Sequence, residues 1–217
     1  MTLRCEPHAE QEPRWPPSGR HVLAQYDDDG VVVYQAYRPE TARFAVEHQR
    51  FGGPTFSFGR MSWVKPNFLW MMFRSGWGTK EGQEVTLAVR LRRSGFDAIL
   101  AAAVPSSPTD AFPDSSAWKA AVRGSEVRLQ WDPDHDPHGR PLARRAIQLG
   151  LRGEMLRRYA TEWIVGVEDV SALVAQQRAL RGTAALSTPR ERVYPVTDEG
   201  LARRLGLVPL APTGVDG

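Results

Sequence analysis

The sequence holds one cysteine, Cys5, and no hydrophobic run long enough to cross a membrane. A single cysteine excludes a disulfide framework within the chain and a cysteine-based zinc site. Apolar runs such as Phe68–Phe73, which is six residues long, are far short of the ~18–20 residues that a bilayer requires. The first 20 residues are charged and proline-rich and lack the apolar region of a secretory signal. We therefore expect a soluble, cytoplasmic protein with no membrane partner.

The common nucleotide-binding and hydrolase signatures are also missing. The sequence has no G-x-G-x-x-G, no Walker A motif, no H-E-x-x-H and no G-x-S-x-G. Each of these motifs positions backbone amides, a metal or a nucleophile for a known chemistry. Any activity must therefore depend on a less common arrangement of side chains.

The composition is that of a globular protein. Of 217 residues, 41% are hydrophobic and 24% are charged, which suits one domain with a buried core. The formal charge of +3 arises from 28 basic and 25 acidic residues. This small excess is compatible with an anionic partner but does not require one.

The order of elements predicts an α+β fold in a single domain, with a largely antiparallel sheet and short helices. Strands are predicted at 20–26, 31–37, 56–61, 85–91, 125–131, 145–151 and 162–167. Short helices are predicted at 40–50, 68–73, 97–103, 116–122, 153–159 and 171–181. The Asp27–Gly30 turn predicts a hairpin between the first two strands. We assign residues 1–19 to a flexible leader, 20–196 to the domain and 197–217 to a tail.

The segment 58–80 has the highest density of residues suited to ligand binding. It holds three of the seven tryptophans and several cations, among them Arg60, Lys65 and Arg74. Aromatic rings stack on nucleobases, and guanidinium groups pair with phosphate oxygens. The alternative interpretation is that the aromatic residues are core and the cations extend from its rim. For 68–73 we favour the core, whereas Arg60, Lys65 and Arg74 remain candidates for ligand binding.

Two further segments carry acidic candidates. The run Asp132–His138 contains carboxylates and two histidines, so a metal-dependent hydrolase is conceivable. Its spacing matches no standard metal site, and turns favour Asp and Pro for local reasons, so we assign no metal ligand. Glu162 stands at the start of the predicted strand 162–167, where a carboxylate can be partly desolvated. The alternative is an exposed carboxylate at a strand edge.

Several segments resemble the domain-of-unknown-function family 4291. They include Ala24–Asp27, Val33–Arg38, Arg145–Arg152 and, most specifically, the long motif Arg60–Trp77, which reads RMSWVKPNFLWMMFRSGW. The resemblance extends from about residue 20 to residue 196. The name of that family implies no activity.

A more remote resemblance links the chain to ADP-ribosyltransferases. Those enzymes place a catalytic glutamate at the start of a late apolar strand, and Thr161–Val165, which reads TEWIV, is similar. The resemblance implies NAD as the cofactor, used as a substrate, and Glu162 as the catalytic residue. The H-G-S and S-T-S triplets of those enzymes are absent, and either Ser62 or Ser75 would substitute for them. Either Gln35 or Arg38 would take the place of the histidine or arginine that those enzymes often have. The residues that would bind NAD are Tyr34, Gln35, Tyr37, Arg38, Arg60, Ser62, Trp63, Lys65 and Arg74.

That resemblance implies a mechanism and a partner. Glu162 would hold the ribose 2′-hydroxyl and stabilise an oxocarbenium-like state as the bond to nicotinamide breaks. ADP-ribose would then pass to a macromolecular acceptor, for which the arginine-rich surface favours DNA or RNA. The competing hypothesis is a non-catalytic nucleic-acid or nucleotide-binding module, in which Glu162 is structural.

Overall fold

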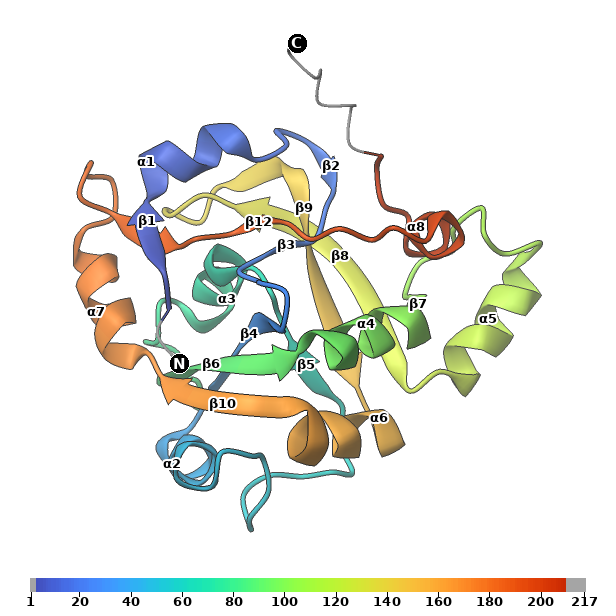
Figure 1. The fold of residues 1–217 in the computed structure, drawn as a ribbon, viewed down its shortest axis with the longest axis horizontal. Coiled ribbons are helices and arrows are strands. Elements are labelled where there is room, and N and C mark those ends of the chain that lie inside the picture. Colours follow the sequence, from blue (N-terminus) through green and yellow to red (C-terminus); the bar gives the residue numbers. More distant parts are fainter. Residues whose placement is uncertain (1–2, 210–217) are drawn as a thin grey trace.

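The computed structural model describes residues 3–209 of the chain. It is a single α+β domain with mostly antiparallel sheets. In Figure 1 helices α2, α5 and α7 lie at the periphery, around the strands. Within the described range, no helix combines the length and the apolar character that a membrane span needs.

The described strands differ widely in length, and the longest are β4, β6, β8 and β9. They are β1 (Cys5–Pro7), β2 (Gly19–Arg20), β3 (Leu23–Ala24), β4 (Gly30–Tyr37), β5 (Ser62–Val64), β6 (Val85–Arg92), β7 (Ala103–Pro105), β8 (Val127–His135), β9 (Pro141–Leu151), β10 (Ile164–Asp169), β11 (Ser187–Pro189) and β12 (Arg192–Val193).

The described helices are short, as predicted. They are α1 (His8–Gln11), α2 (Pro39–His48), α3 (Phe68–Ser75), α4 (Arg93–Ala102), α5 (Ser115–Gly124), α6 (Gly153–Arg158), α7 (Ser171–Ala179) and α8 (Glu199–Leu205), together with a 3₁₀ turn at Glu12–Arg14 and a π-helical turn at Tyr159–Trp163.

The first sheet has the strand order β10-β6-β4, and every pair in it is antiparallel. The β-branched run of β4 suits a strand that is buried on both faces, and Val31, Val32 and Val33 are all buried. Successive side chains of a strand point to opposite faces. Val33 therefore enters one hydrophobic cluster, whereas Val32 and Tyr34 enter a second.

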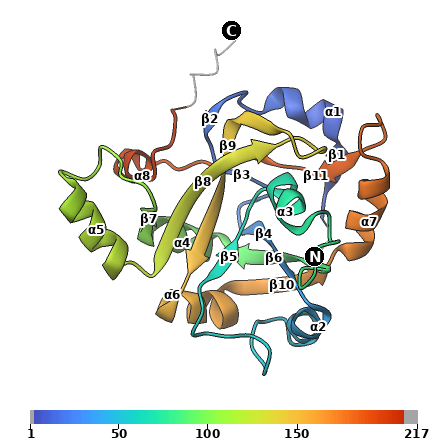
Figure 2. The ribbon, with the colours of Figure 1, turned by 180° about the vertical axis from the view of Figure 1, so that it is seen from behind.

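The second sheet has the order β2-β9-β8-β7, and β5 pairs with β9 beside it. Figure 2 shows the long strands β8 and β9 side by side. The segment after β5 joins the two sheets, because Lys65 forms an isolated antiparallel bridge with Tyr34 of β4. The proline that follows, Pro66, favours the extended backbone that this bridge requires.

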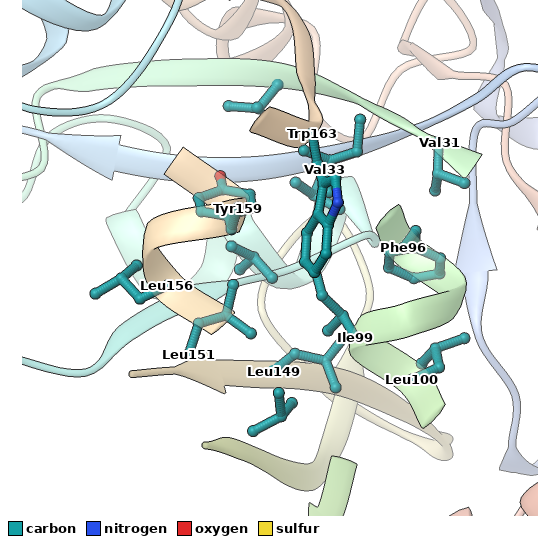
Figure 3. Close-up of a cluster of buried hydrophobic side chains, with 14 of the residues drawn as sticks. Val31, Val33, Phe96, Ile99, Leu100, Leu149, Leu151, Leu156, Tyr159 and Trp163 are labelled. Atoms are coloured by element: carbon teal, nitrogen blue, oxygen red, sulfur yellow. The ribbon is translucent and has the colours of Figure 1, made fainter. Parts of the chain in front are cut away.

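The larger hydrophobic cluster lies between the two sheets and the helices α4 and α6. Figure 3 shows Trp163 between the side chains of Tyr159 and Leu156 and those of Phe96 and Ile99. The indole lies so close to α4 that a Cβ atom on Gly95 would be 2.5 Å from Trp163 Cγ. A side chain at position 95 would therefore displace the tryptophan.

Helix α3 begins at the predicted residue, Phe68, and ends two residues beyond the predicted end, at Ser75. The Asn67 side chain accepts a 2.7 Å hydrogen bond from the Trp70 amide, and Gly76 ends the helix with φ at 58°. A second residue, Glu191, also caps the N-terminus of this helix, and sequence reasoning did not connect the two. The Glu191 carboxylate accepts a 2.6 Å hydrogen bond from the Phe68 amide and a 3.0 Å bond from Asn67 Nδ2.

The segment predicted as a flexible leader is folded where the structure describes it. Its strand β1 pairs with β11, and the Gln11 amide donates to both the carbonyl and the hydroxyl of Thr188 at 2.9 Å. Trp15 is buried, and its indole nitrogen donates to the carbonyl of Glu191. The polar and proline-rich composition suggested disorder, but these residues pair with partners that lie about 180 positions away in sequence. Part of the predicted tail also folds, as α8, while residues 210–217 lie outside the described range.

The predicted hairpin is only partly present. The Asp27 amide donates to the Gly30 carbonyl at 3.0 Å, so the turn forms as expected. Beyond it, one isolated bridge joins Tyr26 to Val31. The residues before the turn instead pair with the C-terminal strand β12, a long-range partner that local turn signals do not reveal.

Candidate functional site

A cleft of about 930 Å³ opens where the two sheets meet. Its walls come from the end of β4, the segment 54–65, helix α3 and the paired strands β8 and β9. Its volume is in the range of pockets that hold a ligand of nucleotide size, about 300–1,000 Å³. The cleft is therefore the first place to look for a function.

A hydrogen-bonded network forms one wall of the cleft. The Gln35 amide nitrogen lies 2.8 Å from Ser62 Oγ and 2.9 Å from the Tyr37 hydroxyl, and the two hydroxyls are 3.0 Å apart. The buried Tyr159 hydroxyl donates to Gln35 Oε1 at 2.6 Å. This bond fixes which end of the amide faces Ser62, so the polar groups of the wall are pre-oriented. Burial raises the pKa of Tyr37 to about 12, so its hydroxyl stays protonated.

The burial of Lys65 is the least expected feature of the cleft. It is only 6% exposed, yet it lines the cleft. No carboxylate of residues 3–209 lies within ion-pair distance of its ammonium. Burial, reinforced by the charge of Arg74, lowers the pKa of Lys65 from 10.5 to about 8, while Asp132 opposes this shift. Burying an unpaired charge destabilises a fold, so this lysine carries an energetic cost in the unliganded protein.

One carboxylate faces the cleft from the opposite wall. Asp132 accepts a 2.9 Å hydrogen bond from Gln130 Nε2 at one oxygen and a 2.7 Å bond from Gln148 Nε2 at the other. The three residues lie on neighbouring strands, with Gln130 paired to Gln148 in the β8–β9 register. Of the described residues that line the cleft, Asp132 is the only acidic one. A carboxylate can accept about four hydrogen bonds, so it retains acceptor capacity for a ligand.

Cations and aromatic residues complete the walls. Arg38, Arg60 and Arg74 are exposed at the cleft, and the half-buried Trp63 also lines it. Trp70 also lines the cleft, and its ring stacks on those of Phe73 and His135. The cleft thus combines positive charge, flat rings and hydrogen-bonding amides.

Most of the residues predicted from sequence come together in this cleft. Eight of the ten line it, namely Gln35, Tyr37, Arg38, Arg60, Ser62, Trp63, Lys65 and Arg74. Tyr34 does not, because alternation along β4 turns its ring into the second hydrophobic cluster, against Phe68. Its hydroxyl is buried there without a hydrogen-bond partner among the described residues.

Glu162 lies outside the cleft. The strand predicted from residue 162 begins at Ile164, and Glu162 belongs to the π-helical turn before it. Its side chain is 56% exposed and lies 3.3 Å from the Arg158 guanidinium, four residues earlier. The expected desolvation is therefore absent, because the chain turns once more before it enters the sheet.

The segment 132–138 does not form a metal site. The predicted loop is instead the end of β8, which continues to His135. Asp134 forms a buried ion pair with Arg144 at 2.8 Å, and His135 stacks on Phe73 with ring centroids 3.6 Å apart. Among residues 3–209, no three His, Cys, Asp or Glu side chains are grouped so that they could hold a metal ion.

Sequence reasoning did not assign two groups to the cleft, Asp132 with its glutamines and Tyr159, because it considered Asp132 only as part of a conceivable metal segment. A signal for the first was present. The apolar residues Ile147 and Leu149 alternate with Gln148, just as Leu129 alternates with Gln130, which predicts one polar face shared by two strands. No local pattern marks Tyr159, whose partner Gln35 is 124 positions away.

Comparison with protein families agrees with the central motif. A family model described as "Domain of unknown function (DUF4291)" matches residues 21–194. The chain belongs to the DUF4291 family. The match includes all the residues that form the network around Gln35, as well as Lys65 and Asp132. No curated protein matches the chain.

Proposed function

We propose that the cleft of this DUF4291 domain binds a nucleotide-type ligand, with NAD as the first candidate. The observation that supports this most directly is Lys65, a buried lysine at the wall of an open cleft with no carboxylate of residues 3–209 within ion-pair distance. A phosphate group would supply the missing negative charge. The arginines at the rim would add the bidentate contacts that guanidinium groups make to phosphate.

The opposite wall suits the remainder of such a ligand. Asp132 is pre-oriented by Gln130 and Gln148 and would accept hydrogen bonds from the hydroxyl groups of a ribose. Trp63 offers a ring on which a base would stack, a contact worth about 1–3 kcal/mol. The Gln35–Ser62 network would donate to or accept from the polar edge of the ligand.

Transfer of ADP-ribose from NAD is the second candidate function. It passes through an oxocarbenium-like state at the ribose, which a carboxylate within the cleft would stabilise. Asp132 occupies such a position, whereas Glu162 does not line the cleft. If the domain catalyses this reaction, we therefore expect it to depend on Asp132, with DNA or RNA as the acceptor that its arginines favour.

The test is calorimetric titration of the purified protein with NAD, ADP-ribose, AMP and adenosine. Adenosine lacks the phosphate, so we expect it to bind at least about tenfold more weakly than AMP, the cost of one charge-assisted contact. Lys65→Met should abolish this preference, and Lys119→Met, an exposed lysine on α5, should leave it unchanged. Failure of all four compounds to bind would refute the proposal. Release of nicotinamide together with the appearance of labelled ADP-ribose on DNA or RNA would report the transfer reaction.

A further inference from the structure

A second, smaller pocket lies away from the cleft and is unusually rich in arginine. It has a volume of about 270 Å³ and is lined by Arg4, Arg90, Arg190 and Arg192, with Asp27 as its one acidic residue among those described. Arg90 comes from β6 and Arg4 from the N-terminal segment. Arg190 comes from the segment that leads into β12, and Arg192 is the first residue of that strand. None of its lining residues lines the cleft.

The two sites are lined by different residues of β4. Val32 lines the arginine pocket, whereas Gln35, Ala36 and Tyr37 at the end of the strand line the cleft. No lining residue is shared between the two sites. A ligand in one site therefore does not compete for the side chains of the other.

The arginines are held in place by the fold rather than by chance contacts. The Arg190 amide donates to the Arg4 carbonyl at 2.7 Å, which sets these two residues side by side. Arg192 donates to the Tyr26 carbonyl at 3.0 Å, and its guanidinium lies 4.5 Å from the centre of the Tyr26 ring. Ring contact and hydrogen bond together orient the planar group before any ligand arrives.

Acidic groups compensate only part of this charge. Asp27 pairs with Arg90 at 2.6 Å, and Glu6 pairs with Arg190 at 2.8 Å. Glu6 is also shared with Arg14. Among the described residues, Arg4 and Arg192 have no carboxylate within ion-pair distance. Like charges held close together repel, and a bound anion would remove this repulsion.

We propose that this pocket is a second anion site, which binds a compact phosphate anion such as phosphate or pyrophosphate. Guanidinium groups match phosphate oxygens in paired hydrogen bonds, which makes phosphate the best-suited anion. The pocket is smaller than sites that enclose a whole drug-sized ligand, about 300–1,000 Å³. A phosphate or pyrophosphate group fits its size, whereas a complete dinucleotide does not.

The experiment is titration with inorganic pyrophosphate in low salt, followed by calorimetry. The variant Arg190→Gln/Arg192→Gln is compared with Arg43→Gln/Arg145→Gln, two exposed arginines outside both sites. Both variants lose two positive charges, so they differ only in the positions from which the charges are removed. Each titration is repeated in a Lys65→Met background, which weakens anion binding by the cleft.

In the Lys65→Met background we expect the pocket variant to bind pyrophosphate at least about tenfold more weakly, and the control less than about twofold more weakly. If both variants lose the same affinity for pyrophosphate, general electrostatic attraction explains the binding and the proposal is overturned. Abolition of all pyrophosphate binding by Lys65→Met alone would overturn it as well. If the double variant does not fold, Arg4→Gln, an exposed residue, serves in its place with the same expected direction.

Discussion

The main chains of Lys65 and Tyr34 exchange two hydrogen bonds, of 2.7 and 3.2 Å. This bridge joins the segment after β5 to the edge of β4 and thereby brings the two sheets together. It also fixes the lysine side chain at the wall of the cleft, while Tyr34 turns into the core. The position of the unpaired ammonium is therefore set by the backbone, not by a carboxylate partner.

Replacing Lys65 by methionine should make the unliganded protein more stable and abolish phosphate-dependent binding. Methionine has a similar shape and fits a buried site, and it removes the cost of an uncompensated buried charge, about 1–3 kcal/mol. Chemical denaturation at pH 7 measures the first effect and calorimetry with AMP the second. Lys119→Met is the matched control and should change neither. A loss of stability in Lys65→Met would show that the ammonium has a partner in the free protein.

The pH dependence of this lysine has opposite signs for folding and for binding. Its pKa is about 8 in the folded protein and near 10.5 in the unfolded chain. Between these values the unfolded chain holds more protons, so the stability of the unliganded protein should rise with pH. Phosphate binding requires the ammonium, so affinity for AMP should fall about tenfold between pH 7 and pH 9 as the amine loses its proton.

Both pH effects are measured as differences from Lys65→Met, which removes the contribution of every other titrating group. Denaturation at pH 8 to 10.5 reports folding, and calorimetry at pH 7 to 9 reports binding. An AMP affinity that stays level up to pH 9 would mean that Lys65 does not contact the phosphate.

The part of the site that sequence reasoning predicted is the part encoded by short segments. Arg60, Ser62, Trp63 and Lys65 are close in sequence, so the motif that contains them identifies one wall of the cleft. The opposite wall depends on the β8–β9 register, which places Gln148 beside Gln130, and register is a long-range property. Most of the strand and helix predictions were confirmed for the same reason, because alternation, caps and glycines are local signals. The strand predicted at 56–61 was wrong, since that segment forms turns and the strand β5 begins only at Ser62.

The errors have a common physical origin in tertiary contacts. Composition made residues 1–19 look disordered, yet Gln11 and Trp15 are bound by the segment around Thr188 and Glu191. Glu162 resembled the first residue of a strand, yet a π-helical turn delays the strand by two positions. The choice between Tyr34 and Gln35 could have been made from sequence, since adjacent strand residues cannot face the same side.

Two buried tyrosines test whether the Gln35 network is pre-oriented by Tyr159. Tyr159→Phe removes the 2.6 Å hydrogen bond to Gln35 Oε1 and leaves a buried acceptor unpaired, so it should destabilise the protein by about 1–3 kcal/mol. Tyr34→Phe removes a hydroxyl that has no partner among the described residues, and it should be neutral or slightly stabilising. Urea denaturation of the two variants gives the comparison. Equal losses of stability would show that Gln35 does not depend on Tyr159.

Comparing variants of Asp132 and Glu162 tests which of these two carboxylates contacts the ligand. Asp132, held by Gln130 and Gln148, should prefer a ligand with ribose hydroxyls. We expect the wild-type protein to bind AMP at least about tenfold more tightly than 2′,3′-dideoxy-AMP, since two hydrogen bonds to a charged group are lost. Asp132→Asn should reduce this ratio towards one, and Glu162→Gln should leave it unchanged, because Glu162 is exposed and outside the cleft. The ratio of two ligands with the same phosphate cancels the general effect of removing a charge. A ratio that responds to Glu162→Gln but not to Asp132→Asn would transfer the role of the carboxylate back to Glu162 and would require the π-helical turn to rearrange when the ligand binds.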